Sequence, residues 1–289
     1  MLKKYNRFLV AYISCYLFVA IFGGISTWHV VATYQGPVVT VSFLDIGQGD
    51  SIAIKLPDDR MILIDAGRDG TVLNRLGAVM PWWKHDIDYL FVTHPDSDHY
   101  GGMFSVVGKY TIRHAYYNGD DDPDKRFDQL KSLIRSKHIP LDVVKAGDVF
   151  TLTKGVAMTI LWPSEGFTKE DDNAASISFD LDAYGHHTIL TADVPIPEEE
   201  KIMKLFPQIH AEVFKLGHHG SKFSSGADFL HALQPTYCIV SAGLHNVYHH
   251  PHPSTLARAY EIGCRILETA KQGTITFTET PFGGVQLAH

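Results

Sequence analysis

The chain has 289 residues, of which 45% are hydrophobic and 20% are charged. These proportions are close to those of globular proteins, leave room for a sizeable core and exclude wholesale disorder. The net charge of −7 with neutral His argues against a highly basic nucleic-acid-binding protein, although bound metal cations can still supply positive charge at a site.

The N-terminal segment is apolar after a basic start. Three basic residues precede position 8, and no Asp, Glu, Lys or Arg then occurs before Asp45. The run 8–25 approaches the roughly 20 apolar residues that cross a bilayer, and the preceding positive charges predict a cytoplasmic N-terminus. We therefore expect residues 1–35 to be a single transmembrane anchor in the cell membrane, with the rest of the chain outside the cytoplasm. A cleaved signal peptide, which would make the protein secreted, and a buried core helix are the alternatives.

Short apolar runs separated by turn residues dominate the rest of the chain. They predict successive strands, the first of which are 38–44, 51–56, 61–67 and 87–93. Helical spacing or helix-start residues mark 124–137, 197–206 and 253–263. Strands interspersed with helices predict one layered α/β domain over residues 36–289, with two sheets covered by helices.

The three cysteines match no zinc motif and no disulfide framework by their spacing. Cys15 lies in the apolar N-terminal run. Cys238 and Cys264 each lie in a strand-like apolar stretch, which favours buried thiols. A structural disulfide between these two is the less favoured alternative.

The stretch THPDSDH (93–99) follows a predicted buried strand and carries four metal-binding side chains, those of His94, Asp96, Asp98 and His99. On a loop that leaves the end of a strand, this tight spacing lets the side chains point to two neighbouring sites, which suits a pair of divalent ions. A polar turn with an Asp helix cap is the alternative, but a cap does not require two His and two Asp.

Further His and Asp residues follow other apolar runs: Asp193, the pair His218 and His219, and then His250 and His252. Taken singly, such a residue is usually a turn residue or a solvated side chain. Because sites in layered α/β folds form where strand ends converge, the clusters together predict one metal centre.

Six motifs, in order over residues 38–280, closely resemble the extracytoplasmic hydrolase domain of ComEC-type competence (DNA-uptake) proteins, which have the metallo-β-lactamase fold. The motifs are FLDIGQGDSIAI (43–54), LIDAG (63–67), THPDSDHYGG (93–102), LTADV (190–194), LGHHGSKFSS (216–225) and HHPHPS (249–254). The resemblance implies a four-layer αβ/βα sandwich with its metal site at the sheet edges. Those proteins carry a multi-spanning channel region where this sequence has one apolar segment, which argues against DNA translocation by this chain.

The resemblance also implies ligand roles. The ligands would be His94, Asp96, Asp98 and His99, with Asp193 bridging two ions and one of His218 and His219 completing a site. THPDSDH resembles the signature His-x-His-x-Asp-His, with Asp96 in place of the second His. Lactamase-type members carry a further His before the bridging Asp; the stretch DDNAASISF has none, and Asn173 is the candidate substitute.

Replacement of a His by Asp gives the site a harder oxygen ligand, which favours manganese or magnesium. The remaining imidazoles also suit zinc, so zinc is not excluded. We expect two divalent ions, with manganese ahead of zinc. Asp98 and Asp193 would hold the ions and a nucleophilic water between them. His250 or His252 would supply the proton to the leaving group, and fixing the loop is the alternative role for both.

Five other residues are expected near the centre. Ser221 and Lys222 follow the His pair and would contact a substrate phosphate. Asp65 would brace a ligand as a second-shell carboxylate. Asp45 and Asp50, in LDIGQGDS, are first interpreted as turn residues, with a second-shell role as the alternative.

The sequence therefore predicts a membrane-anchored, extracytoplasmic, two-metal hydrolase, and the resemblance to ComEC-type proteins implies a phosphodiesterase or nuclease acting on DNA. A hydrolase of another ester or phosphodiester, such as a lactone or an envelope polymer, is one alternative. A non-catalytic metal-binding surface module is another. The expected partners are the substrate, the membrane and a separate channel or envelope protein.

Overall fold

The computed structural model describes residues 36–120, 125–167 and 172–288, with the isolated residues 16, 18, 20 and 23. The chain divides into two compact units, Met1–Gly36 and Pro37–His289. The predicted anchor over residues 8–25 lies mostly outside the described residues. Within the described part of the chain, no helix combines the length and the apolar character that a membrane crossing requires.

In the described residues of the second unit, the first sheet has eight strands in the order β15-β14-β1-β2-β3-β4-β5-β6. β3, β4, β5 and β6 run parallel to one another, and the remaining pairs are antiparallel. The strands are β1 (Val39–Phe43), β2 (Ile52–Lys55), β3 (Met61–Ile64), β4 (Asp86–Val92), β5 (Thr111–Tyr117), β6 (Leu141–Val143), β14 (Ile275–Thr280) and β15 (Gly284–Ala288).

The second sheet has seven strands in the same described region, in the order β13-β12-β11-β10-β9-β8-β7. β10 to β13 are parallel and β7 to β10 are antiparallel. The strands are β7 (Val149–Thr153), β8 (Val156–Trp162), β9 (Ser178–Ala183), β10 (His186–Leu190), β11 (Val213–Lys215), β12 (Tyr237–Val240) and β13 (Arg265–Glu268).

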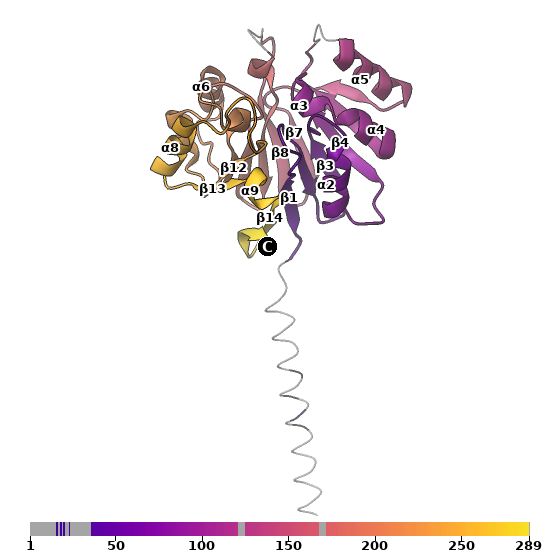
Figure 1. The fold of residues 1–289 in the computed structure, drawn as a ribbon. Helices are drawn as coiled ribbons and strands as arrows, with labels where there is room; N and C mark the ends of the chain where they lie inside the picture. The colour runs from indigo at the N-terminus through magenta and orange to yellow at the C-terminus, as the bar shows by residue number, and fades with distance from the viewer. Residues whose placement is uncertain are drawn as a thin grey trace, which may run out of the picture. The chain divides into compact units, whose positions relative to one another are not determined.

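The helices lie mainly on the outer faces of the sheets (Figure 1). On the side of the first sheet are α2 (Thr71–Val79), α3 (Ser97–Tyr100), α4 (Met103–Lys109) and α5 (Lys125–Ser136). With the second sheet are α6 (Ile196–Leu205), α7 (Ala227–Leu233), α8 (Pro253–Glu261), α9 (Thr269–Gln272) and the short 3-10 turns η1 (Asn173–Ala175) and η2 (Gly217–Gly220).

Three apolar cores separate the four layers. Side chains from both sheets, including Phe43, Phe91 and Phe179, form the core between them. A second core lies between the first sheet and α2, α4 and α5, where Leu130 is fully buried. A third lies between the second sheet and α6, α7 and α8, where Phe229 is buried. The predicted α/β domain with two sheets covered by helices is therefore confirmed.

A disulfide joins Cys238 on β12 to Cys264 just before β13, with 5.9 Å between the Cα atoms. The expectation of two buried thiols is therefore wrong in its chemistry, although both side chains are buried. Parallel pairing places Cys238 opposite Ile266, two residues beyond Cys264. The spacing of 26 residues along the chain gives no hint of this proximity.

Candidate metal centre

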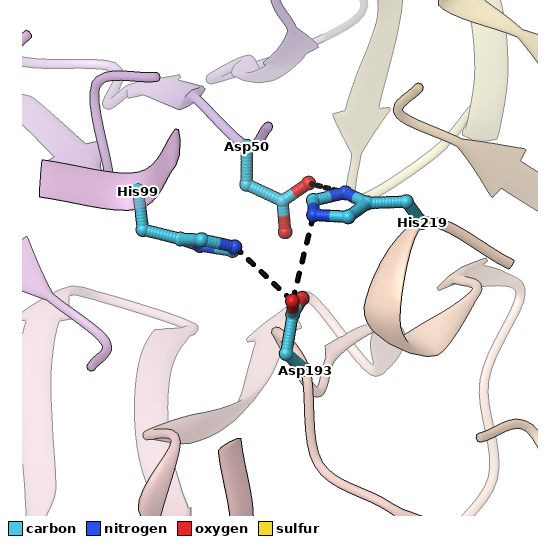
Figure 2. A group of neighbouring side chains, drawn as sticks. All are labelled: Asp50, His99, Asp193 and His219. Atoms are coloured by element: carbon cyan, nitrogen blue, oxygen red, sulfur yellow. Dashed lines mark ion pairs between the residues drawn. The ribbon is translucent and has the colours of Figure 1, made fainter. Parts of the chain in front are cut away.

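The polar residues predicted to form a metal centre lie where strands end. His99 lies on α3, the short helix after β4; Asp193 follows β10, and His219 lies on η2 after β11. Asp50 lies on the connection between the antiparallel strands β1 and β2. Figure 2 shows that these four side chains converge, two from the N-terminal half of the domain and two from the C-terminal half.

The four side chains are close enough to hold one cation. One ligand atom from each of Asp50, His99, Asp193 and His219 lies within 4.8 Å of the others, and all four residues are buried. Asp193 Oδ2 lies 3.3 Å from His99 Nε2 and 3.4 Å from His219 Nε2 (Figure 2). Asp98 adds an oxygen 3.4 Å from the same His219 nitrogen.

Several polar atoms of this cluster are buried and lack a hydrogen-bond partner within the described part of the chain. They are Nε2 of His94, His99 and His219, and Oδ1 of Asp193. Such orphaned groups cost roughly 1–3 kcal/mol each, so native proteins rarely keep several together. Imidazole nitrogens and carboxylate oxygens are the donors that zinc and manganese take, so the residues fit a metal centre.

His99 is oriented by Asp65. Its Nδ1 lies 2.8 Å from Asp65 Oδ2, which leaves Nε2 facing the centre. Asp65 also accepts hydrogen bonds from the backbone N and hydroxyl of Thr93, at 2.9 Å and 2.7 Å. A carboxylate that holds the far nitrogen of a ligating His fixes its tautomer and its ring orientation. The structure thus places Asp65 where a bracing residue belongs.

His219 is oriented by a backbone carbonyl. Its Nδ1 donates to the Ser241 carbonyl at 2.8 Å, which leaves Nε2 facing the cluster. His218 and His219 both adopt left-handed backbone conformations, with φ of 47° and 55°. Consecutive non-glycine residues in this region are strained, and such strain gathers at functional sites. The strained turn directs His219 into the cluster while His218 remains partly exposed.

Asp50 approaches the cluster because of a glycine. Gly49 has φ of 116°, and a Cβ at this position would lie 2.0 Å from the Asp98 carbonyl oxygen. Only glycine permits both features. Asp50 Oδ2 then forms an ion pair with Lys215 Nζ at 2.5 Å, while Oδ1 lies 3.3 Å from His219 Nδ1. Lys215 is fully buried and also donates to the Ala192 carbonyl at 3.2 Å.

The remaining predicted ligands border this cluster. His94 is fully buried, and its Nε2 lies 3.6 Å from Asp96 Oδ2, whose side chain is 43% exposed. The ring centroids of His94 and His99 are 4.1 Å apart. His218 Nε2 lies 3.6 Å from Asp193 Oδ2. All the predicted ligands therefore lie in one contiguous group, with Asp193 near its middle.

The charges of this group are coupled. Burial would raise the pKa of Asp193, but the neighbouring imidazoles of His219 and His99 hold it well below its ordinary value. Burial would lower the pKa of His219, but Asp193 and Asp50 raise it to about 9. The pKa of Asp98 is also lowered, because the hydrogen bond from His219 and the charge of His99 outweigh its burial. The carboxylates thus favour positive charge at the centre, which a divalent cation also supplies.

Of the two predicted proton donors, His250 lies beside the cluster. Its ring centroid is 5.4 Å from that of His218. Burial, followed by the charges of His218 and His219, lowers the pKa of His250 to about 4, so its imidazole is neutral near pH 7. His252 has the alternative, structural role: its Nδ1 accepts from the Ser254 backbone N at 3.2 Å and caps α8.

Two further predictions change with the structure, and the predicted substrate contact of Lys222 stays a prediction. Asp45 is not a bracing carboxylate, because it forms a surface salt bridge to Arg75 at 2.8 Å. Ser221 is buried, and its Oγ accepts from the Phe223 backbone N at 3.3 Å, so it shapes the loop instead of facing substrate. Lys222 is exposed, and its Nζ lies 4.8 Å from the centroid of the Phe223 ring.

Asp50 is the residue that sequence reasoning undervalued. Its motif, GQGD, favours a tight turn, and a turn does explain the positive φ of Gly49. One feature of the sequence does point to Asp50: it is a carboxylate that follows Gly47 and Gly49 in a loop between two apolar strands. Its partner, Lys215, carried no signal, because a Lys at the end of an apolar run is normally interpreted as solvated.

A family model described as the metallo-beta-lactamase superfamily matches residues 44–243, which include every member of the cluster. The chain belongs to this superfamily. The αβ/βα arrangement of two sheets and the metal-binding side chains at their edge are therefore those of a metallo-β-lactamase fold. Members of this superfamily are in general metal-dependent hydrolases.

Two curated relatives extend the comparison. ComE operon protein 3 of Bacillus subtilis is 31% identical over 259 residues, covering 82% of this chain and 32% of that protein. Competence protein ComA of Neisseria gonorrhoeae is 29% identical over 248 residues, covering 82% of this chain and 32% of that protein. Both are ComEC-type competence proteins, so the predicted resemblance is confirmed. The chain spans about a third of the length of these relatives.

Among solved structures, the metallo-beta-lactamase fold protein YhfI of Bacillus subtilis superposes with a TM-score of 0.57 at 14% identity. The match covers 84% of this chain and 100% of that one. At this identity the likeness shows the fold alone.

Proposed function

We propose that this metallo-β-lactamase-fold chain is an extracytoplasmic phosphodiesterase that uses two divalent metal ions to cleave DNA. The observation that carries the proposal is the buried group of imidazole and carboxylate atoms around Asp193, several of which have no hydrogen-bond partner within the described residues. The relationship to competence proteins supports DNA as the substrate.

The ligands divide into two neighbouring sets. His94 and Asp96 face each other on one side, and Asp98, His99 and His219 gather on the other. Asp193, which lies beside His99, His218 and His219, is the group suited to bridge the two ions. Asp96 gives the first set a hard oxygen donor in place of an imidazole, which favours manganese over zinc.

The ions would polarise a phosphoryl group and lower the pKa of a bound water. The chain's own residues position the reactants. Asp65 fixes the orientation of the His99 ring, and the Ser241 carbonyl fixes that of the His219 ring. His250, neutral and half-buried beside His218, is placed to accept or pass on a proton at the edge of the centre.

Two features support a location outside the cytoplasm. The apolar run over residues 8–25, preceded by basic residues, suits a single membrane anchor with the domain on the far side. The Cys238–Cys264 disulfide suits an oxidising compartment, because cytosolic thiols are normally kept reduced. A separate channel protein and other envelope components are the partners that such a location suggests.

The test is cleavage of single- and double-stranded DNA by the full chain in detergent, with manganese, zinc or a chelator. Asp98→Asn is expected to lower the rate at least 100-fold, since it removes a charged ligand from the centre. Asp45→Asn makes the same chemical change in a carboxylate that is paired with Arg75, and should leave the rate unchanged.

Absence of DNA cleavage by a protein that binds two metal ions would overturn the nuclease assignment. The substrate would then be another ester or phosphodiester, such as a lactone or an envelope polymer. Absence of bound metal would overturn the hydrolase assignment itself and leave a surface module.

A further inference from the structure

A cavity of about 520 Å³ adjoins the metal centre. His218 forms part of its wall, and the same side chain lies 3.6 Å from Asp193 Oδ2. A group that fills the cavity therefore has one end at the cluster. We propose that this cavity is a subsite for one nucleobase of a nucleic-acid substrate, next to the scissile phosphodiester. The proposal rests on the proposed phosphodiesterase function and deepens it.

The walls of the cavity are mostly apolar. Pro195, Ile196 and Ala174 line it, and Phe223 adds an aromatic ring that is 64% exposed. Large exposed rings are costly in water and are used by proteins that bind single-stranded nucleic acids as surfaces on which bases stack. A volume of this size falls within the range of small-molecule subsites and accommodates a nucleoside monophosphate.

The backbone that carries the Phe223 ring is held in place before substrate arrives. The Phe223 carbonyl accepts a hydrogen bond from the Ile196 backbone N at 2.9 Å, and the Phe223 N donates to Ser221 Oγ at 3.3 Å. Phe223 follows the strained His218–His219 turn after three residues. The ring and the metal-binding imidazoles therefore belong to one ordered loop, which limits the entropy lost when a base stacks.

The polar groups of the cavity suit the edge of a base better than a phosphate. The one cationic group in the described wall, Lys201, is already paired with Glu198 at 2.9 Å. Asn173 contributes a buried side-chain oxygen that has no hydrogen-bond partner among the described residues, and it can accept from an exocyclic amino group. A phosphate would gain little there, so it stays at the metal centre while the base enters the cavity.

The test compares a single-stranded oligonucleotide with the same oligonucleotide made abasic at one nucleotide beside the scissile phosphate. The full chain in detergent is assayed with manganese. Phe223→Ala should lower kcat/KM for the complete oligonucleotide about 5- to 150-fold, the range expected for one stacked base, and should leave the abasic substrate unaffected. The matched control is Phe282→Ala, which removes a ring that is 78% exposed in the β14–β15 turn.

An equal effect of Phe223→Ala on both substrates, or no effect on either, would overturn the subsite. Fluorescence anisotropy of the labelled oligonucleotides provides a readout that does not depend on hydrolysis. If the wild type cleaves neither substrate but binds the complete one more tightly, and that advantage is lost in Phe223→Ala, the subsite stands and the phosphodiesterase function falls. If no such advantage exists, the subsite falls as well.

Discussion

The buried ion pair between Lys215 and Asp50 decides whether Asp50 is free to act as a metal ligand. Lys215 Nζ lies 2.5 Å from Asp50 Oδ2, and both side chains are buried. Removal of one partner of such a pair costs about 3–5 kcal/mol, whereas replacement of both by neutral groups of similar shape is often nearly neutral. We therefore expect Lys215→Met to lower the free energy of unfolding by about 3–5 kcal/mol, and the double variant Lys215→Met/Asp50→Asn to lower it far less.

The assay is urea unfolding of residues 37–289, the unit that contains all three cores, in the presence of a chelator. The chelator is needed because bound metal stabilises the folded state by itself. Together with the two single variants, the double variant closes a cycle whose coupling energy should reach about 2 kcal/mol or more. If the two single losses simply add in the double variant, to within about 0.5 kcal/mol, the pairing argument is refuted.

Metal content of the same variants tests the second half of the reasoning. Because Lys215 and the far nitrogen of His219 occupy the two Asp50 oxygens, Asp50 should position His219 without binding an ion. The double variant should then retain the wild-type number of metal ions per chain. Loss of an ion from the double variant, but not from Asp45→Asn, would show that Asp50 is a ligand.

Three further outcomes follow from the structure. Burial raises the pKa of Glu279 to about 8, above its ordinary 4.5, so the folded state binds the extra proton in this window. The contribution of Glu279 to the free energy of unfolding is therefore complete at low pH and falls by about 1.4 kcal/mol per pH unit between roughly pH 5 and 8. Urea unfolding at several pH values should show that Glu279→Gln removes this dependence. The double replacement Cys238→Ala/Cys264→Ala should lower the free energy of unfolding by about 3.5 kcal/mol, measured in the same way, because it opens a loop of 26 residues. Asp65→Asn should weaken metal binding about 10- to 100-fold in chelator competition, since it releases the ring of His99.

Periodicity predicted the outer layers of the fold because their helices each bury one face. The helices expected over 124–137 and 253–263 are α5 (Lys125–Ser136) and α8 (Pro253–Glu261). In α5, Phe127, Leu130 and Ile134 are buried at helical spacing against the first sheet. Such a pattern is local, so it is visible in the sequence without knowledge of what covers it.

The ligand positions were also accessible from the sequence where they follow parallel strands. His99 follows β4 of the first sheet and Asp193 follows β10 of the second, each at the carboxyl end of a strand. Because sites in layered α/β folds form where strand ends converge, both could be assigned to one centre from their places in the chain. The same logic gave no choice between His218 and His219. That choice depends on the backbone: the left-handed turn places His219 in the cluster and leaves His218 beside it.

Pairwise contacts between distant elements could not be predicted. Cys238 and Cys264 meet because β12 and β13 are neighbouring strands. The order of strands in a sheet cannot be inferred from the spacing of residues along the chain. Asp45 and Asp50 belong to the same motif, yet Asp45 pairs with Arg75 at the surface and Asp50 turns inward to Lys215. Which of two carboxylates is buried is decided by a cation that lies far away in the sequence.

The position of Asp50 and Lys215 has a consequence for the whole domain. Asp50 and His99 follow strands of the first sheet, whereas Asp193 and His219 follow strands of the second (Figure 2). Lys215 is the last residue of β11 in the second sheet, so the centre joins the two sheets at one edge. Elsewhere the sheets are held mainly by apolar contacts, which are non-directional and tolerate small shifts between layers, although Thr188 on β10 also donates a hydrogen bond to Glu279 on β14 at 2.7 Å. The ion pair and the converging imidazoles are directional, and they set the relative position of the two sheets at the edge where the ligands must meet. A shift of the sheets by 1 Å would separate Asp193 from His99, and metal affinity therefore depends on the packing of the core between the sheets as much as on the ligands themselves.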